Sequence, residues 1–157
     1  MAGEYYLKFD GIEGSSQSKT HSKYVDIVKF STGSRRNVLN RLVSDVAGRG
    51  QFDLFTFVHS IDAATPKFHS ACLTGNEIKF AELEVCNSAN GQEKVYFYMK
   101  LEHIKIVRVK VITEGYDVPM EKVELTVGKI TWRTTLPSPD KQTKGSVETT
   151  FDQVRNQ

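Results

Sequence analysis

The stretch from Ile61 to Gly75 constrains the fold most, because it is the only convincing helix in a chain otherwise rich in strand patterns. We expect Thr65 to cap it ahead of Pro66, and Gly75 to end it in a left-handed conformation. Four apolar residues recur at helical spacing along one stripe: Ala64, Phe68, Ala71 and Cys72. A helix of about three turns is unstable alone in water, so it must pack on a larger apolar surface. The sequence therefore predicts a helix over about residues 64–74, with core contacts at Phe68, Ala71 and Cys72.

The rest of the chain shows only strand patterns, so the apolar stripe of the helix must pack on a β-sheet. Strand patterns with a period of two cover residues 5–9, 51–59, 77–86, 95–111 and 123–132. Residues 24–31 are also rich in strand formers but carry apolar residues on both faces, as in a strand that is covered on both sides or faces a neighbouring molecule. In the longest of these segments the apolar face changes near His103 and Ile106, as in a strand that bends around a barrel corner. We therefore predict a mainly β protein: a β-barrel of two packed antiparallel sheets with one flanking α-helix. At 157 residues, the chain is expected to form a single domain over 1–157.

Composition excludes several classes of function. The net charge of +2 is too small to predict a nucleic-acid partner, and no apolar run is long enough to span a bilayer. The first residues lack the basic and apolar regions of a signal peptide, so synthesis in the cytoplasm is expected. Cys72 and Cys86 both lie in apolar surroundings, which favours buried thiols over a disulfide.

Residues 32–51 are predicted to form a long protruding loop, partly helical or extended, because their aliphatic residues have helical spacing but no strong cap supports a helix. Loops of this length in a compact domain are usually functional or disordered. The segment contains aliphatic residues between basic ones but no aromatic residues suited to base stacking. Its basic residues are Arg35, Arg36, Arg41 and Arg49. This composition favours a protein–protein contact, with a merely solvated loop as the alternative.

No set of catalytic residues emerges from the sequence. Phosphate-binding loops, nucleophile elbows and zinc-protease motifs are missing, so we predict neither an enzyme nor a cofactor. His69 and Cys72 have a spacing that could place two ligands on one metal, but no third ligand lies nearby, and a structural role is favoured. The other histidines are scattered and are expected to be solvated or locally hydrogen-bonded: His21, His59 and His103. Three strand glutamates are expected to face outward: Glu82, Glu84 and Glu102.

Several motifs in order along the chain resemble one family. They are Leu7–Ser16, Lys19–His21, Val25–Ile27, Ile61–Lys67, Ala71–Gly75, Tyr98–Ile104, Pro119–Leu125 and Lys129–Trp132. Together they resemble the haemolysin-coregulated protein (Hcp) family, whose members form the tube of bacterial type VI secretion systems. The chain departs from the family pattern at Phe30–Gly33, in the basic segment that follows, and at Gly145–Gln157, which is only weakly similar. These departures concern the choice of partner and cargo.

The resemblance implies a structural protein that assembles as hexameric rings, which stack into a tube and carry effectors in the lumen. The implied partners are other copies of the chain, a spike protein, a contractile sheath and effector proteins, without nucleic-acid binding or membrane insertion. Secretion through the type VI system would then need no signal peptide. By analogy, Lys29 and Ser31 are candidate lumen-facing residues, and the candidate ring-stacking loop comprises Arg35, Arg36, Leu39, Arg41 and Leu42. The alternative is a monomeric β-barrel binding module for a small ligand or nucleic acid.

Overall fold

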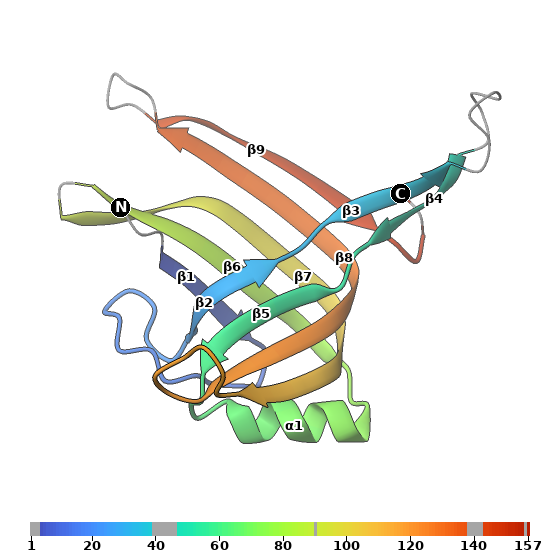
Figure 1. The fold of residues 1–157 in the computed structure, drawn as a ribbon. Helices are drawn as coiled ribbons and strands as arrows, with labels where there is room; N and C mark the ends of the chain where they lie inside the picture. Colours follow the sequence, from blue (N-terminus) through green and yellow to red (C-terminus); the bar gives the residue numbers. More distant parts are fainter. Residues whose placement is uncertain (1–3, 39–46, 90, 138–142, 156) are drawn as a thin grey trace.

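The computed structural model describes residues 4–38, 47–89, 91–137, 143–155 and 157 (Figure 1). Over these residues the chain forms nine strands and one helix. In order, they are β1 (Glu4–Phe9), β2 (Val25–Ser31), β3 (Ser34–Val38), β4 (Ala47–Phe52), β5 (Phe55–Ser60), α1 (Thr65–Thr74), β6 (Ile78–Ala89), β7 (Gln92–Ile112), β8 (Met120–Pro137) and β9 (Thr143–Asp152).

Six strands close into a barrel. The main sheet has the order β5-β2-β1-β6-β7-β8-β9, and β5 also pairs with β8, which joins the two sides. All of these pairings are antiparallel. Strand β9 lies beyond the closure, and β3 and β4 form a second, two-stranded sheet that projects from the barrel (Figure 1). The prediction of a mainly β barrel with a single helix is confirmed.

The barrel interior is filled by the apolar face of each strand. Leu7, Phe57 and Leu125 are fully buried, and each comes from a different strand of the closed barrel. The long strand β7 changes register against β8 between Ile106 and Arg108, and His103 has a positive φ of 57°. These irregularities lie where the sequence pattern predicts a break. The change of phase lets Met99 and Leu101, before His103, and Ile104 and Ile106, after it, point into the same core.

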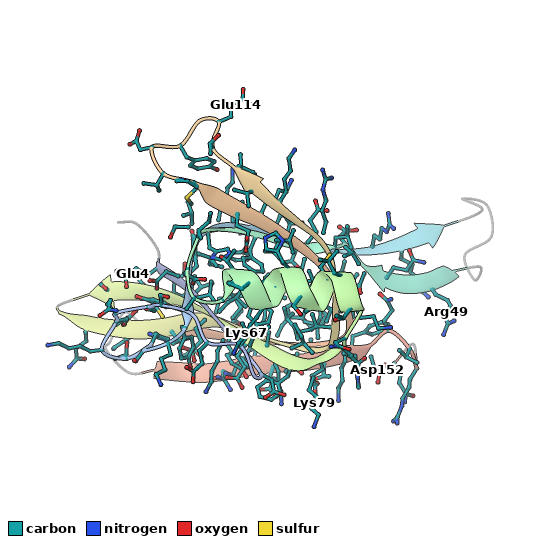
Figure 2. All side chains as sticks on the ribbon, turned by 90° about the horizontal axis from the view of Figure 1, so that it is seen from below. Glu4, Arg49, Lys67, Lys79, Glu114 and Asp152 are labelled. Atoms are coloured by element: carbon teal, nitrogen blue, oxygen red, sulfur yellow. The ribbon has the colours of Figure 1, made fainter. Side chains whose placement is uncertain are left out.

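Helix α1 lies across one end of the barrel (Figures 1 and 2). Phe68 is fully buried and meets the rings of Phe9 and Phe57 edge-on, with centroids 5.0 and 5.7 Å away. Ala71 and Cys72 are partly buried and pack against the same core. Among the described residues no helix is long and apolar enough to cross a membrane.

The two ends of the helix differ in how well the sequence predicts them. Gly75 ends α1 with a φ of 72°, as expected. The expected cap at Thr65 is wrong, because Thr65 is already helical and Ala64 occupies the capping position without a side-chain hydrogen bond. Asp62 takes part of that role: its Oδ1 accepts a hydrogen bond of 2.8 Å from the Ala64 amide, while Thr65 Oγ1 accepts one of 3.2 Å from the Asp62 amide.

The segment predicted as a protruding loop, partly helical or extended, contains an antiparallel pair of strands. Strands β3 and β4 pair Arg35 with Gln51 and Arg36 with Gly50, and the hairpin extends away from the barrel (Figure 1). At its base, the Phe52 amide donates a hydrogen bond of 2.7 Å to Gln153 Oε1. We call β3, β4 and this base the arm. Leu39, Arg41 and Leu42 lie outside the described residues.

Candidate functional site: a polar cluster at His21 and the predicted assembly surfaces

The loop between β1 and β2 folds back over the outer side of the barrel. Gly14 and Ser16 donate backbone hydrogen bonds to Lys23 and Tyr24, at 2.8 and 3.0 Å, which makes the loop double back on itself. A Cβ atom at Gly14 would lie 2.5 Å from the Tyr24 carbonyl oxygen, so this close approach requires glycine. The loop thereby places His21 against the outer face of β1 and β6.

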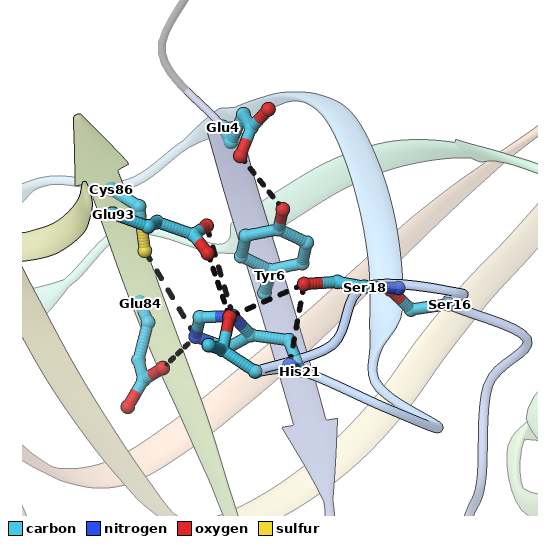
Figure 3. A network of polar contacts seen from close by, with 9 residues as sticks. Glu4, Tyr6, Ser16, Ser18, His21, Glu84, Cys86 and Glu93 are labelled. Carbon is cyan, nitrogen blue, oxygen red and sulfur yellow. Dashed lines mark hydrogen bonds and ion pairs between the residues drawn. The ribbon is translucent and has the colours of Figure 1, made fainter. Parts of the chain in front are cut away.

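His21 is the centre of a cluster of polar side chains (Figure 3). Its ring stacks on Tyr6 with centroids 4.1 Å apart and planes within 3° of parallel. Nε2 contacts a carboxylate oxygen of Glu84 and lies 3.9 Å from Cys86 Sγ. Nδ1 lies 2.9 Å from Thr20 Oγ1, which donates a hydrogen bond of 2.6 Å to Glu93 Oε2. We call His21, Glu84, Cys86 and Glu93, with their partners Thr20, Tyr6 and Glu4, the His21 cluster.

The buried acidic surroundings shift several pKa values in the His21 cluster. Burial, with Glu93 nearby, raises the pKa of the Cys86 thiol to about 12. Burial and the hydrogen bond to Glu4 also raise the pKa of Tyr6. Burial would raise the pKa of Glu93, but the hydrogen bond from Thr20 and the proximity of His21 outweigh it, so that this pKa is lowered. At neutral pH, Cys86 is therefore a protonated thiol near the ionised carboxylate of Glu93.

A second buried network joins α1 to the barrel wall. Glu121 on β8 is fully buried and accepts hydrogen bonds from His59 Nε2 at 2.9 Å and His69 Nε2 at 3.1 Å. His59 belongs to β5 and is also fully buried, whereas the side chain of His69 on α1 is 40% exposed. The sequence predicts His21 and His59 to be solvated or locally hydrogen-bonded. Both are buried, because the loop covers one and the helix covers the other, and His21 has its local partner in Thr20.

The residues predicted for assembly lie on two separate surfaces. Lys29 and Ser31 are exposed on β2, after a register shift between Ile27 and Lys29. Arg35 and Arg36 are exposed on the arm, where Arg35 Nε lies 3.5 Å from Asp53 Oδ1. The first pair lies at the end of β2, and Arg35 and Arg36 follow in β3, the next strand along the chain.

Sequence reasoning missed the His21 cluster. Its members come from β1, the following loop, β6 and β7, and His21 and Glu84 are separated by 63 positions. No local spacing reveals such a cluster. The only signal for the cluster in the sequence is the Lys19–His21 motif, which contains a histidine in the loop that turns back on β1.

Solved structures share this architecture over nearly the whole chain. One described as a type six secretion system protein matches with a TM-score of 0.89 and 21% identity, covering 99% of each chain. Hcp1 from Salmonella typhimurium matches with a TM-score of 0.83 and 21% identity over 99% of this chain and 98% of its own. A mutant of Hcp1 from the E. coli EAEC 042 pathovar gives 0.75 and 24% over 97% and 99%. The fold is therefore the barrel of the Hcp proteins.

The amino-acid sequence identifies the same class of protein as the fold. Residues 6–133 match the family described as "Type VI secretion system effector, Hcp", and the chain belongs to this family. No sequence among the curated proteins matches.

Proposed function

We propose that this protein is a tube subunit of a type VI secretion system, which forms hexameric rings that stack into a tube and carry effectors in the lumen. The observation that carries the proposal is the match of the whole chain to Hcp structures, together with the family match over residues 6–133. The closed barrel also leaves β9 and the arm with edges that pair with no strand among the described residues. Unpaired strand edges in soluble proteins need cover, and neighbouring copies would provide it.

The exposed side of β2 supports a role for Lys29 and Ser31 in lining the lumen. Cross-strand partners share one face of a sheet, and the register places Lys29 in a row that contains Val58, Lys122 and Lys110. The adjacent row contains Ser31, Thr56, Glu124 and Arg108. Basic side chains outnumber acidic ones on this surface, which we call the β2 face. A lumen lined by the β2 face would favour effectors with acidic surfaces.

Microscopy of the purified protein tests the assembly. Negative-stain images combined with light scattering should show rings with a central hole and the mass of six chains. A monomer at high protein concentration would contradict the proposal and favour the alternative binding module.

A charge reversal tests the lining. We expect Lys29→Glu to leave the rings intact and to lower the amount of effector that co-purifies with them roughly 5-fold, which corresponds to about 1 kcal/mol. Lys79→Glu is the matched control, because Lys79 is exposed on β6 and is not part of the β2 face (Figure 2). Equal effector recovery from both variants would remove Lys29 from the cargo surface.

A further inference from the structure

Three side chains of the His21 cluster bring together a nitrogen, a sulfur and an oxygen donor. His21 comes from the β1–β2 loop, Cys86 from β6 and Glu93 from β7, and their ligand atoms lie within 4.8 Å of one another. His21 and Cys86 are buried, at 5% and 0% exposed, and the side chain of Glu93 is 17% exposed. We propose that these three residues form a structural binding site for a divalent transition-metal ion of the zinc type.

The donor set and its spacing suit such an ion. Imidazole, thiolate and carboxylate are the three kinds of ligand that zinc takes in proteins. With metal–ligand bonds of about 2.0–2.3 Å, the ligand atoms of a tetrahedral site lie roughly 3.2–3.8 Å apart. His21 Nε2 and Cys86 Sγ are 3.9 Å apart, close to that range. Because all three ligand atoms lie within 4.8 Å of one another, side-chain movements of about 1 Å would close the site.

The partners of His21 leave the correct nitrogen available. Thr20 Oγ1 donates its hydrogen to Glu93 Oε2, so it accepts one from His21 Nδ1. This arrangement places the unshared pair of a neutral imidazole on Nε2, the atom that faces Cys86. A hydrogen bond to the other ring nitrogen is the usual device that orients a histidine ligand. Thr20 thus orients His21 and Glu93 together.

Two features call for a positive charge in the cluster. The unshared pair on Nε2 would meet a Glu84 carboxylate oxygen directly, so a proton or a cation must lie at that contact. In addition, Glu93 Oε1 is buried and has no hydrogen-bond partner among the described residues, and His21 Nδ1 lies 3.8 Å from it. Buried acceptors without a donor are rare in folded proteins. A metal ion would satisfy both groups, with Glu84 or a water completing the coordination.

A cavity of about 420 Å³ lies beside the cluster, and its lining includes the cluster members Glu4 and Tyr6 together with Ser16, Ser18 and Asp26. The three proposed ligands do not line this cavity. A bound ion would fasten the loop to β6 and β7, and the protons displaced from Cys86 and from the His21–Glu84 contact would pass to water.

Cobalt titration tests the site on the full chain after removal of any purification tag. We expect Co²⁺ to bind with one ion per chain and to produce the near-ultraviolet charge-transfer absorption of a thiolate ligand. Zn²⁺ should abolish that band by competition. Binding of Co²⁺ without the charge-transfer band, or no binding, would overturn the proposal and leave a proton between His21 and Glu84.

The two cysteines provide a matched pair of variants. Cys72→Ser, on α1, should retain the band, whereas Cys86→Ser should lose it. Glu93→Gln should weaken Co²⁺ binding at least 10-fold without changing the fold, which circular dichroism would verify. If Cys86→Ser fails to fold, the wild-type band and the affinity of Glu93→Gln decide the question. A band that persists in folded Cys86→Ser, or unchanged affinity in Glu93→Gln, would contradict the assignment.

Discussion

Glu121 shows how much one residue contributes to the attachment of the helix. It is fully buried and bridges His59 on the barrel wall to His69 on α1. A buried carboxylate is tolerated only when its partners compensate for lost hydration, and the removal of one partner from a buried pair is strongly destabilising. Its position at the start of β8 gave no sign of this role, because both partners are distant in the sequence.

We therefore expect Glu121→Gln to lower the free energy of unfolding by about 3 kcal/mol, because an amide cannot accept hydrogen bonds from both histidines at full strength. Denaturant unfolding at neutral pH would measure the loss. Glu77→Gln is the matched control: Glu77 Oε1 lies 3.6 Å from His103 Nδ1, but both side chains are at least half exposed. Exposed pairs contribute little, so this variant should change stability by less than about 1 kcal/mol. Equal losses would mean that burial of Glu121 is not the cause.

At the scale of elements, the C-terminal strand holds the arm. The Phe52 ring meets Trp132 and Phe151 edge-on, with centroids 5.9 and 5.8 Å away. Gly50 lies so close to Phe151 that an added Cβ would be 3.1 Å from its ring. Arg49 also donates a hydrogen bond of 3.3 Å to the Val154 carbonyl. Strand β9 and the residues after it therefore fasten the base of the arm to the barrel.

Phe151→Ala should loosen the arm while leaving the barrel intact. Aromatic pairs of this kind contribute about 1 kcal/mol, so we expect amide hydrogen exchange in β3 and β4 to become roughly 5-fold faster. Hydrogen-exchange mass spectrometry would locate the change. Val147→Ala is the control, since Val147 is 75% exposed on the same strand. If the two variants exchange alike, the aromatic contacts do not fasten the arm.

The sequence predicted elements whose signals are local. The helix, its end at Gly75 and the break in the long strand near His103 all follow from spacing and residue type. The arm was not predicted as a hairpin, because its pairing depends on contacts with Phe151 and Gln153 about a hundred positions away. The His21 cluster was not predicted either, because its residues are also far apart in the sequence. The burial of Phe68, by contrast, follows from its place on the apolar stripe of the helix.

At the scale of the whole molecule, the arm projects away from the barrel (Figure 1), and we propose it as the contact with a neighbouring ring. We expect Leu39→Asp to leave single rings intact and to weaken their stacking, because a charge at an apolar contact must lose its hydration. Leu73→Asp introduces the same change at a leucine that is 86% exposed on α1, and serves as the control. Electron microscopy would compare tube lengths. Tubes of equal length in the two variants would exclude Leu39 from the stacking contact.

Strands β7 and β8 each extend, with local bulges, from the barrel wall into the three-stranded ribbon that they form with β9. Hydrogen bonds between antiparallel strands lie perpendicular to the strands, so a force along these strands loads many bonds in shear at the same time. A force applied to the ribbon along its strands would therefore displace the whole barrel as one body. A pull at right angles would instead open the β8–β9 pairing one bond at a time.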